Sequence, residues 1–369
     1  MSLSNVSKFR AALKEKGFDG AVVSSHFNQF YLSSFDYHDG YFVITNKNAY
    51  VITDSRYEEA AHRALDHNSE IEIVLPEKRA TLTIADIFKK DGCKSVAFEE
   101  TDLSVDSFAR ISSAVNDVCG EIMKISEGGV ASKLLDGLRV CKSPQEIEQI
   151  KRAQAITDAA FSHILNVIKP DMTEIEVALE LEFFMRKNGA DGLAFDTIAV
   201  NAENSSMPHG VPGNNKLKRG FLTMDFGARF GGYCSDMTRT VCIGKADEEM
   251  KRLYNTVLEA QNLAIEFVEY GKKCADVDAV ARNHIYDNGY KGYFGHSLGH
   301  GVGLLIHEEP RFSFAAGDVT VDVGHVITVE PGIYLPGKYG CRIEDMITIT
   351  EDKRVVDLTH SPKELIEIL

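Results

Sequence analysis

Long apolar runs and basic residues are both scarce in this chain of 369 residues. No apolar run approaches the roughly 18 residues that a membrane-spanning helix needs, so we expect no membrane partner. The first 20 residues lack the apolar core of a secretory signal, and Phe9, Leu13 and Phe18 instead have the spacing of a short amphipathic helix. Lys and Arg number 40 against 55 Asp and Glu, a formal net charge of -15 at pH 7. Such a surface repels phosphate backbones, so nucleic acid is not an expected partner.

Cysteine spacing and overall composition place the chain among ordinary globular proteins. The seven cysteines are odd in number, scattered, and never spaced Cys-x-x-Cys. This pattern favours reduced, packed thiols, and we expect a cytoplasmic protein. Apolar residues make up 44% and charged residues 26%, which excludes a disordered, collagenous or coiled-coil chain. At roughly 150 residues per domain, the length predicts two or three domains.

Residues 1–128 alternate between short β-rich runs and helical patterns, which predicts a smaller α/β domain. The β-rich runs begin at Gly20, Gly40, Ala49 and Lys94, and helical patterns begin at Tyr57 and Leu82. The break at Glu127-Gly128-Gly129 marks the expected boundary. We expect the second domain to cover residues 133–369.

The second part of the chain contains two similar series of elements. Ser143 to Glu146 and Thr173 to Glu176 are both capping boxes, which begin a long and a shorter helix before a strand-rich stretch. Helical patterns over 247–270 and up to 289 precede strands in the same order. The recurrence predicts a duplicated α+β unit.

The segment 223–236, TMDFGARFGGYCSD, predicts a β-hairpin whose turn contains Gly231-Gly232. If the turn is centred between Phe230 and Gly231, Asp225 lies directly opposite Asp236, with Cβ atoms roughly 5 Å apart. Two such carboxylates repel each other unless one is protonated or a cation lies between them. One exposed Asp and one turn Asp would be the ordinary alternative, but the cross-strand register favours the cation.

The segment 295–309, GHSLGHGVGLLIHEE, contains three of the twelve histidines: His296, His300 and His307. Neutral imidazole is the commonest nitrogen ligand for a transition metal and the usual proton shuttle near neutral pH. The interleaved glycines would let the backbone approach a ligand closely. A lone His is more often a structural residue, but three with this glycine content favour a functional site.

Two glutamates lie within apolar β-runs, Glu330 in ITVEPG and Glu344 in RIEDMITIT. Pro331 ends the first strand because proline cannot donate to a ladder, and Arg342 shares a face with Glu344. A buried Glu is unfavourable unless it is paired or metal-bound. For each Glu alone, the solvent face of an edge strand is an equal alternative.

Taken together, these segments supply four carboxylates and one imidazole, from Asp225, Asp236, His300, Glu330 and Glu344. Four negative charges match two divalent cations, and oxygen-rich ligation favours Mn²⁺, Fe²⁺, Co²⁺ or Zn²⁺ over a thiolate-type site. Two such ions can lower the pKa of a shared water, which indicates hydrolytic chemistry.

At these residues the sequence resembles the pita-bread metallopeptidases, the family of Xaa-Pro aminopeptidase, Xaa-Pro dipeptidase and methionine aminopeptidase, which also contains metal-free creatinase. The resemblance is carried by MDFGARFGGYCSDMTRT, GHSLGHGVGLLIHEEP, ITVEPGIY and RIEDMITIT, with NSSMPHG upstream. It implies an α+β pita-bread catalytic domain over 133–369. The segments SSHFNQFYLSSF and VITDSRYEEA resemble the creatinase-type N-terminal domain, which implies that domain for 1–128.

The resemblance also implies roles for individual residues. It implies a dinuclear metal site in which Asp236 and Glu344 bridge the ions; Mn²⁺ is expected, with Co²⁺, Zn²⁺ and Fe²⁺ as alternatives. His209 is expected near the scissile bond, and His307 is expected to stabilise the tetrahedral intermediate. We expect Glu330 to accept the proton of the attacking water in addition to binding metal.

His296 and Arg342 match substrate-binding residues of the proline-directed branch of the family. His325 is a departure, because Met is more usual at that position. A homodimer is the habit of the family.

The expected activity is that of an Xaa-Pro aminopeptidase, which cleaves between an N-terminal residue and proline. The alternatives are an Xaa-Pro dipeptidase (prolidase) and a non-catalytic binding module of the same fold. A methionine aminopeptidase generally lacks the N-terminal domain, creatinase has lost the ligands that this chain keeps, and the complete ligand set argues against a binding module. The sequence does not separate aminopeptidase from dipeptidase, because that depends on whether the space beyond proline is blocked.

Overall fold

The computed structural model describes residues 3–120, 124–125, 128–169 and 171–369. The chain divides into two compact units, Met1–Arg139 and Val140–Leu369. Among the helices in the described ranges, none combines the length and the apolar character that a membrane crossing requires. None of the seven cysteines, all of which lie in those ranges, forms a disulfide; five are buried as predicted, whereas Cys119 is partly buried and Cys141 is exposed.

The first unit is built on a six-stranded mixed sheet with the strand order β4-β3-β2-β1-β5-β6. Strand β2 pairs antiparallel with β1 and β3, and the other neighbours are parallel. The strands are β1 (Gly20–Val23), β2 (Tyr41–Thr45), β3 (Ala49–Ile52), β4 (Ile71–Val74), β5 (Ser95–Phe98) and β6 (Lys124–Ile125).

Strand side chains alternate between the two faces of this sheet, and helices pack against it. Val22 and Val43 pack with apolar residues of α4 (Ala80–Asp91) and α5 (Val105–Cys119) in one core. Helix α1 (Asn5–Glu15), whose Phe9 and Leu13 are buried as expected, contacts β1 and β2. The unit also contains α2 (His26–Ser33) and α3 (Glu58–Leu65). It is the α/β domain that the sequence predicts, although the sequence indicates neither α2, α5 nor β4.

Helix α6 (Val130–Val140) contacts the first unit along its length. The Ser132 hydroxyl accepts a hydrogen bond from the Thr101 amide at 3.2 Å, and the Arg139 guanidinium donates to Asn28. By its contacts the chain therefore divides at the end of α6, beyond the expected break at Gly128-Gly129. Glu127 of that break lies outside the described residues, and the limits 1–128 and 133–369 stay predictions.

The second unit contains two pairs of helices, each a longer helix followed by a shorter one. They are α7 (Pro144–Val167) with α8 (Glu174–Lys187), and α9 (Glu248–Phe267) with α10 (Cys274–Ile285). Both predicted capping boxes form, with Ser143 and Thr173 as the N-caps. Isolated β-bridges join Thr173 to Lys216 and Lys273 to Thr320, at corresponding places before α8 and α10.

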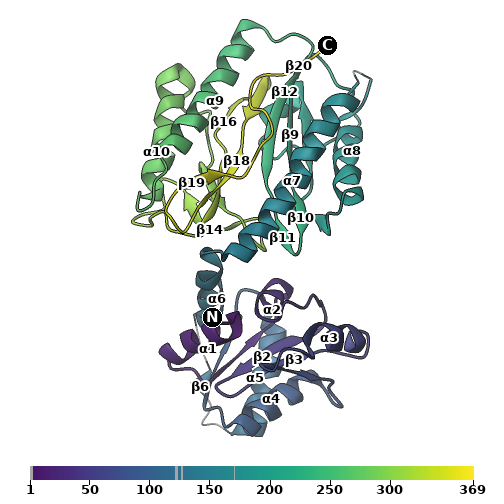
Figure 1. Ribbon diagram of the computed structural model, residues 1–369, viewed down its shortest axis with the longest axis vertical. Coiled ribbons are helices and arrows are strands. Elements are labelled where there is room, and N and C mark those ends of the chain that lie inside the picture. Colours follow the sequence, from purple (N-terminus) through teal and green to yellow (C-terminus); the bar gives the residue numbers. More distant parts are fainter. Residues whose placement is uncertain (1–2, 121–123, 126–127, 170) are drawn as a thin grey trace. The chain divides into compact units, whose positions relative to one another are not determined.

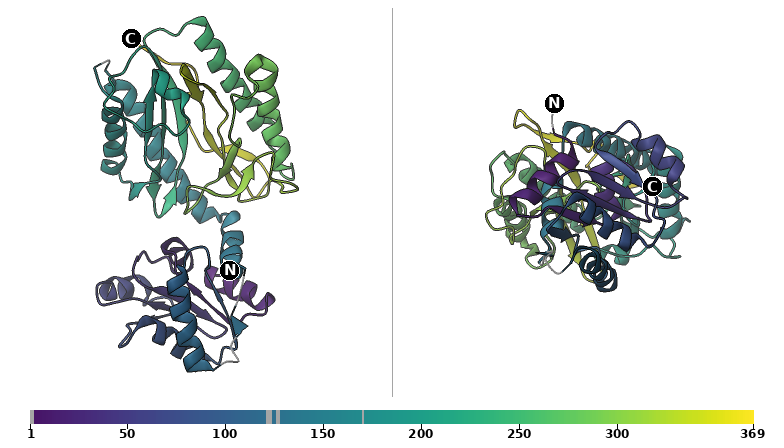
Figure 2. Two further views of the ribbon diagram at one scale, coloured as in Figure 1. Left: turned by 180° about the vertical axis from the view of Figure 1, so that it is seen from behind. Right: turned by 90° about the horizontal axis from the view of Figure 1, so that it is seen from below.

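The strands of the second unit lie between the two helix pairs (Figures 1 and 2). Its larger sheets have the orders β20-β12-β9-β8 and β14-β13-β15-β18-β19, and its smaller ones β11-β10-β7 and β16-β17. Each helix pair thus precedes a set of strands, which is the repeated order predicted from the sequence. The bounds are β7 (Gly192–Leu193), β8 (Ile198–Asn201), η1 (Ala202–Ser206), β9 (Gly220–Phe226), β10 (Ala228–Phe230), β11 (Tyr233–Cys234), β12 (Met237–Ile243), η2 (Tyr286–Tyr290), β13 (Gly299–Gly301), β14 (Glu308–Phe312), β15 (Val326–Val329), β16 (Gly332–Leu335), β17 (Tyr339–Arg342), β18 (Asp345–Ile349), β19 (Val355–Asp357) and β20 (Glu367–Ile368).

The hairpin register differs from the predicted one. Phe230 pairs with Tyr233, and Asp225 lies opposite Thr238 rather than Asp236. The reason is the turn: Gly231 and Gly232 both have positive φ, 57° and 81°, so they form the two-residue loop together. A shift of two residues leaves each side chain on its predicted face, because the period of a strand is two. Asp225 and Asp236 therefore still face the same side, as diagonal rather than direct neighbours.

The capping box of α7 can be tested by Ser143→Ala. The Ser143 hydroxyl accepts a hydrogen bond from the Glu146 amide, so its loss should lower the free energy of unfolding by about 1 kcal/mol. Thermal or denaturant unfolding measures the change. Ser162→Ala in the same helix is the control, because that hydroxyl is exposed and bonds only within its own helix, to the Asp158 carbonyl. Equal stability of the two variants would contradict the capping role.

Candidate metal centre and active site

One cavity of the second unit, of about 390 Å³, gathers every site residue predicted from the sequence. Asp225 comes from β9, Asp236 from the link between β11 and β12, and His300 from β13. Glu330 follows β15, and Glu344 lies between β17 and β18. The complete set of predicted residues on its wall is His209, Asp225, Asp236, His296, His300, His307, Glu330, Arg342 and Glu344.

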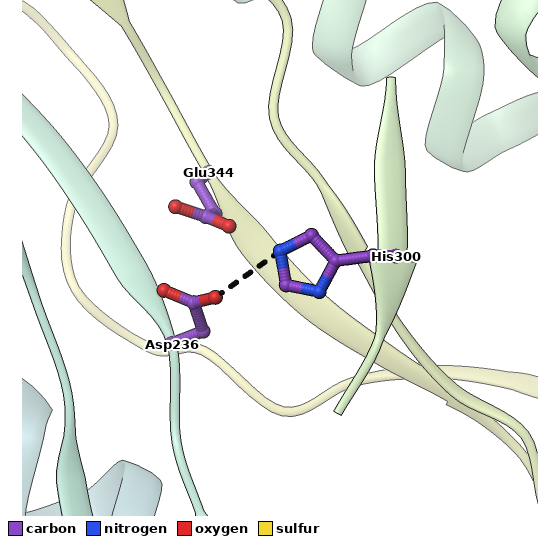
Figure 3. Close-up of side chains that lie close together, drawn as sticks. All are labelled: Asp236, His300 and Glu344. Carbon is purple, nitrogen blue, oxygen red and sulfur yellow. Dashed lines mark ion pairs between the residues drawn. The ribbon is translucent and has the colours of Figure 1, made fainter. Parts of the chain in front are cut away.

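At the centre of the set, Asp236, His300 and Glu344 are buried, and they offer ligand atoms within 4.8 Å of one another (Figure 3). Nε2 of His300 lies 3.6 Å from Oδ2 of Asp236 and 3.4 Å from Oε1 of Glu330. Asp225 accepts a hydrogen bond from Arg342 through Oδ2 at 2.7 Å. Its Oδ1 is buried and has no hydrogen-bond partner among the described residues.

Local backbone geometry fixes the two glutamates. Pro331 follows Glu330 at the end of β15, and the Glu330 amide donates to the Leu298 carbonyl at 2.8 Å. The Glu344 amide donates to the Thr238 carbonyl, and the Thr238 hydroxyl donates to Oε2 of Glu344 at 2.6 Å. Glu344 is 1% exposed, so the solvent-face alternative does not hold for it.

Two glycines beside His300 allow close contacts between segments of the chain. A Cβ on Gly299 would lie 1.9 Å from the Thr328 carbonyl oxygen, and one on Gly301 would lie 2.4 Å from the Glu309 carbonyl oxygen. These glycines therefore let neighbouring segments of the chain pack closely. At this point the pairing of β13 with β14 shifts register between His300 and Gly301, which is a β-bulge.

Burial and like charge dominate the electrostatics of the cluster. Burial, then the neighbouring carboxylates of Asp225 and Glu330, hold the pKa of Asp236 well above its ordinary value. Burial, then Asp236 and Glu330, do the same to the pKa of Glu344. Burial, reinforced by the Asp225 carboxylate and opposed by Arg342, raises the pKa of Glu330 to about 8. Without a cation, these groups repel one another.

His300 has the protonation state of a metal ligand. Burial lowers its pKa to about 3, so the imidazole is neutral. Its Nδ1 lies 3.0 Å from the Gly301 carbonyl oxygen, which places the proton on Nδ1. The lone pair of Nε2 then faces the carboxylates, which is the usual arrangement of a ligating histidine and its backbone partner.

Arg342 and His296 are joined through Tyr334, a residue that the sequence does not single out although it follows in the motif EPGIY. Arg342 donates to the Tyr334 hydroxyl at 2.7 Å, and that hydroxyl lies 3.0 Å from Nε2 of His296. Nδ1 of His296 lies 2.8 Å from the Ser297 carbonyl oxygen. Both ring nitrogens of His296 therefore already have partners in the protein. The predicted contact with the substrate would be made by the surface of the ring rather than by a nitrogen.

His209 and His307 are exposed on the same wall. The His307 ring packs edge-on against His300, with centroids 4.4 Å apart. Burial and the nearby Arg311 lower the pKa of His307, so its imidazole is neutral at pH 7. Their exposure fits groups that act on a substrate, as predicted, rather than groups enclosed in the carboxylate cluster.

The sequence also misses Arg311 of β14, which lines the cavity. Its side chain is 44% exposed, and its Nε lies 3.4 Å from the exposed carboxylate of Glu309. The sequence EEPRF gives no signal for it; in the structure β14 alternates between buried and exposed residues, and Arg311 lies on the same side as Glu309.

This donor set fits divalent cations. Four carboxylates and one neutral imidazole face one another, and a buried carboxylate oxygen of Asp225 has no other partner among the described residues. A cation would satisfy that oxygen and remove the repulsion that raises the pKa values of Asp236 and Glu344.

Comparison with known proteins agrees with this geometry. Residues 148–351 match the model of metallopeptidase family M24, and residues 5–141 match that of the creatinase/prolidase N-terminal domain. The chain belongs to metallopeptidase family M24. Its match to this metallopeptidase family and to Xaa-Pro peptidases shows that the chain is a metallo-exopeptidase, and the family implies divalent metal ions. The α+β pita-bread fold with its creatinase-type N-terminal domain is confirmed.

Three relatives of this M24 peptidase cover nearly its whole length. The Xaa-Pro dipeptidase of Pyrococcus horikoshii is 35% identical over 368 residues, which is 98% of each chain. The solved Xaa-Pro dipeptidase from Bacillus anthracis is 39% identical, with a TM-score of 0.90 over 98% of this chain and 99% of that one. The solved X-Pro aminopeptidase from Thermotoga maritima MSB8 is 35% identical, with a TM-score of 0.87 over 97% of this chain and 100% of that one.

The carboxylate cluster can be tested by Asp236→Asn. In the metal-free M24 peptidase the substitution should raise the melting temperature at neutral pH, because it removes one of several mutually repelling buried carboxylates. With Mn²⁺ or Co²⁺ added, the order should reverse. The metal stabilises the wild type by binding its folded state, and the variant binds it weakly.

Melting curves with chelator and with each metal measure both effects. Asp318→Asn is the control, because that carboxylate is exposed and paired with Lys273, away from the cavity. A variant that bound metal as tightly as the wild type would show that Asp236 is not a ligand.

Proposed function

We propose that this M24 peptidase is an Xaa-Pro dipeptidase, which hydrolyses the bond between an N-terminal residue and a C-terminal proline. The single observation that carries the proposal is Arg311 on the wall of the cavity that contains the carboxylate cluster. A dipeptide presents a free ammonium group and a free carboxylate a few ångströms apart. The metal ions that the cluster would hold suit the amino end, and an exposed guanidinium suits the carboxylate end.

The relatives support the same choice. Of the two activities expected from the sequence, the Xaa-Pro dipeptidase was the alternative, and the names of the full-length relatives favour it over the aminopeptidase. Because the solved relative from Thermotoga maritima is named an X-Pro aminopeptidase, the aminopeptidase activity is the second candidate. The two differ in what must fit beyond proline, which is where a charged group such as Arg311 would act.

In this proposal Asp225, Asp236, His300, Glu330 and Glu344 would hold two divalent ions. When bound, such ions supply polarisation of the scissile carbonyl and lower the pKa of the attacking water. We expect Mn²⁺, with Co²⁺, Zn²⁺ and Fe²⁺ as alternatives. A homodimer and a cytoplasmic location also stay predictions.

The side chains of the chain perform the proton and hydrogen-bonding steps. Glu330 accepts the proton of the attacking water through a carboxylate oxygen. His307, neutral at pH 7, donates a ring N–H to the oxyanion, and His209 holds the scissile amide.

Proline selectivity is assigned to the apolar part of the cavity wall. Phe195, Ile198, Pro208 and Ile306 line it beside the charged groups. An Xaa-Pro bond is a tertiary amide without an N–H, so a site for it needs a pocket for the pyrrolidine ring rather than an acceptor for that proton.

The histidines can be separated by role. His307→Ala and His209→Ala should keep their metal and lose kcat by on the order of 10²–10³, because each removes one positioned donor to the reacting groups. His300→Ala should lose metal affinity as well as activity, because its Nε2 faces the cluster. Metal content, melting temperature and kcat are measured on each variant. Near-normal turnover of both His307→Ala and His209→Ala would end the substrate roles proposed for them.

The distinction between dipeptidase and aminopeptidase can be tested with Arg311→Gln. The wild type should cleave an Xaa-Pro dipeptide far better than Xaa-Pro-amide or an Xaa-Pro-Yaa tripeptide, because only the dipeptide places a carboxylate next to proline. Loss of one charge-assisted contact should lower kcat/KM for the dipeptide roughly 10- to 100-fold and leave the amide nearly unchanged.

Arg354→Gln is the matched control, because that arginine is exposed and pairs with Asp352 outside the cavity. Equal cleavage of dipeptide and tripeptide by the wild type would favour the aminopeptidase. A metal-loaded enzyme that cleaves none of these substrates would contradict proline-directed activity altogether.

A further inference from the structure

Two residues without a role in the proposed chemistry form a buried ion pair behind His307. Nζ of Lys142 lies 2.9 Å from Oε2 of Glu308, and the two side chains are 1% and 3% exposed. Glu308 directly follows His307, and Lys142 directly precedes Ser143, the N-cap of α7. The pair therefore joins the start of a long helix to the segment that carries a proposed catalytic histidine.

Glu308 also braces the turn that precedes it. Its Oε1 accepts a hydrogen bond from the Leu305 amide at 3.2 Å. A Cβ on Gly303 would lie 2.5 Å from Oε2 of Glu308, so only glycine leaves room for the carboxylate there. The Gly303 carbonyl in turn accepts from the Cys234 amide at 2.8 Å. The carboxylate is thus packed inside the turn 303–307.

Lys142 is fixed independently of this turn. Its amide donates to the Gly324 carbonyl at 2.8 Å, and its Nζ donates to the Val140 carbonyl at 3.3 Å. The neighbouring His325 is buried, and burial and the Lys142 charge lower its pKa to about 4. His325 is therefore neutral, and it does not compete with Lys142 for the Glu308 carboxylate.

A buried ion pair adds little net stability compared with an apolar pair of similar volume, but loss of one partner leaves an uncompensated charge. Its distinctive effect is to permit only one arrangement of the segments that it joins. Here one of those segments ends at His307, whose ring contacts His300 at the cavity wall.

We propose that Lys142 and Glu308 are positioning residues for catalysis: their ion pair sets the turn 303–307 so that the His307 imidazole stands over the reacting groups. Neither residue lines the cavity. The inference rests on the proposed function, because it requires that His307 takes part in turnover.

A double-mutant cycle tests the proposal. Lys142→Met and Glu308→Gln are each made in the wild type and in His307→Ala. A displacement of about 1 Å can lower turnover on the order of 10²-fold, so each should lower kcat by about that factor in the wild type while metal content and KM change little. In the His307→Ala background neither should lower kcat further, because the group that they position is absent.

A second variant covers failure to fold. Lys142→Met/Glu308→Leu leaves no uncompensated buried charge, and it should show the same dependence of kcat on His307. Val277→Ala is the control for simple destabilisation, because Val277 is buried in the apolar core of the same unit. It should lower the melting temperature and leave kcat unchanged below that temperature.

The outcomes separate the inference from the proposed function. Equal losses of kcat in both backgrounds would show a merely structural effect and overturn the positioning role. Unchanged kcat of the Lys142 and Glu308 variants, with a large loss in His307→Ala, would also overturn it but leave the proposed function intact. Normal turnover of His307→Ala would overturn the role of that histidine and this inference with it.

Discussion

The mutual repulsion of four carboxylates around one imidazole is the constraint on which the rest of the catalytic unit depends. Each carboxylate comes from a different segment, so the fold must bring like charges together before a cation can bind. The buried guanidinium of Arg239 helps to hold these segments together. It donates to the Thr238 and Glu344 carbonyls and pairs with Asp345 at 2.7 Å. On the cavity side, Arg342 neutralises part of the charge of Asp225. The framework thus holds the proposed ligands in place through backbone and cationic contacts that do not involve a metal, as expected of a preorganised site.

Outside the cluster, each of the two proposed substrate histidines lies on a segment that a buried carboxylate holds. Glu308 packs within the turn that leads to His307. Glu174, at the start of α8, accepts hydrogen bonds from the Asn201 amide at 2.7 Å, the Asn204 side chain at 3.0 Å and the Gly213 amide at 3.3 Å. His209 lies between the last two of these partners. The unit therefore uses acidic residues in two ways: some face one another in the cavity, and some organise loops.

Local features could be predicted from the sequence, and features set by distant contacts could not. Both capping boxes form because a Ser or Thr and a Glu three residues later decide them without help from elsewhere. The face shared by Asp225 and Asp236 was predictable, since it depends on the strand period, but their register depended on which two residues form the turn. Tyr334 and Lys142 gave no signal, because a lone Tyr or Lys acquires its role only from the partners that the fold supplies. The close packing of Gly299 and Gly301 against Thr328 and Glu309 gave no sequence signal either, since a contact between strands cannot be read from a glycine alone.

These contacts also indicate how long a fragment must be to keep the catalytic unit intact. The segment recognised as typical of the family runs from 148 to 351. Lys142 and the N-cap Ser143 precede it, whereas β20 pairs with β12 after it. The carbonyls of Ser361 and Pro362, also beyond its end, accept hydrogen bonds from Arg239 behind Glu344. A fragment trimmed to 148–351 would therefore retain every proposed metal ligand but lose the helix cap and the ion pair at one end and the hydrogen bonds to Arg239 at the other. The catalytic unit is therefore longer than the segment by which its family is recognised.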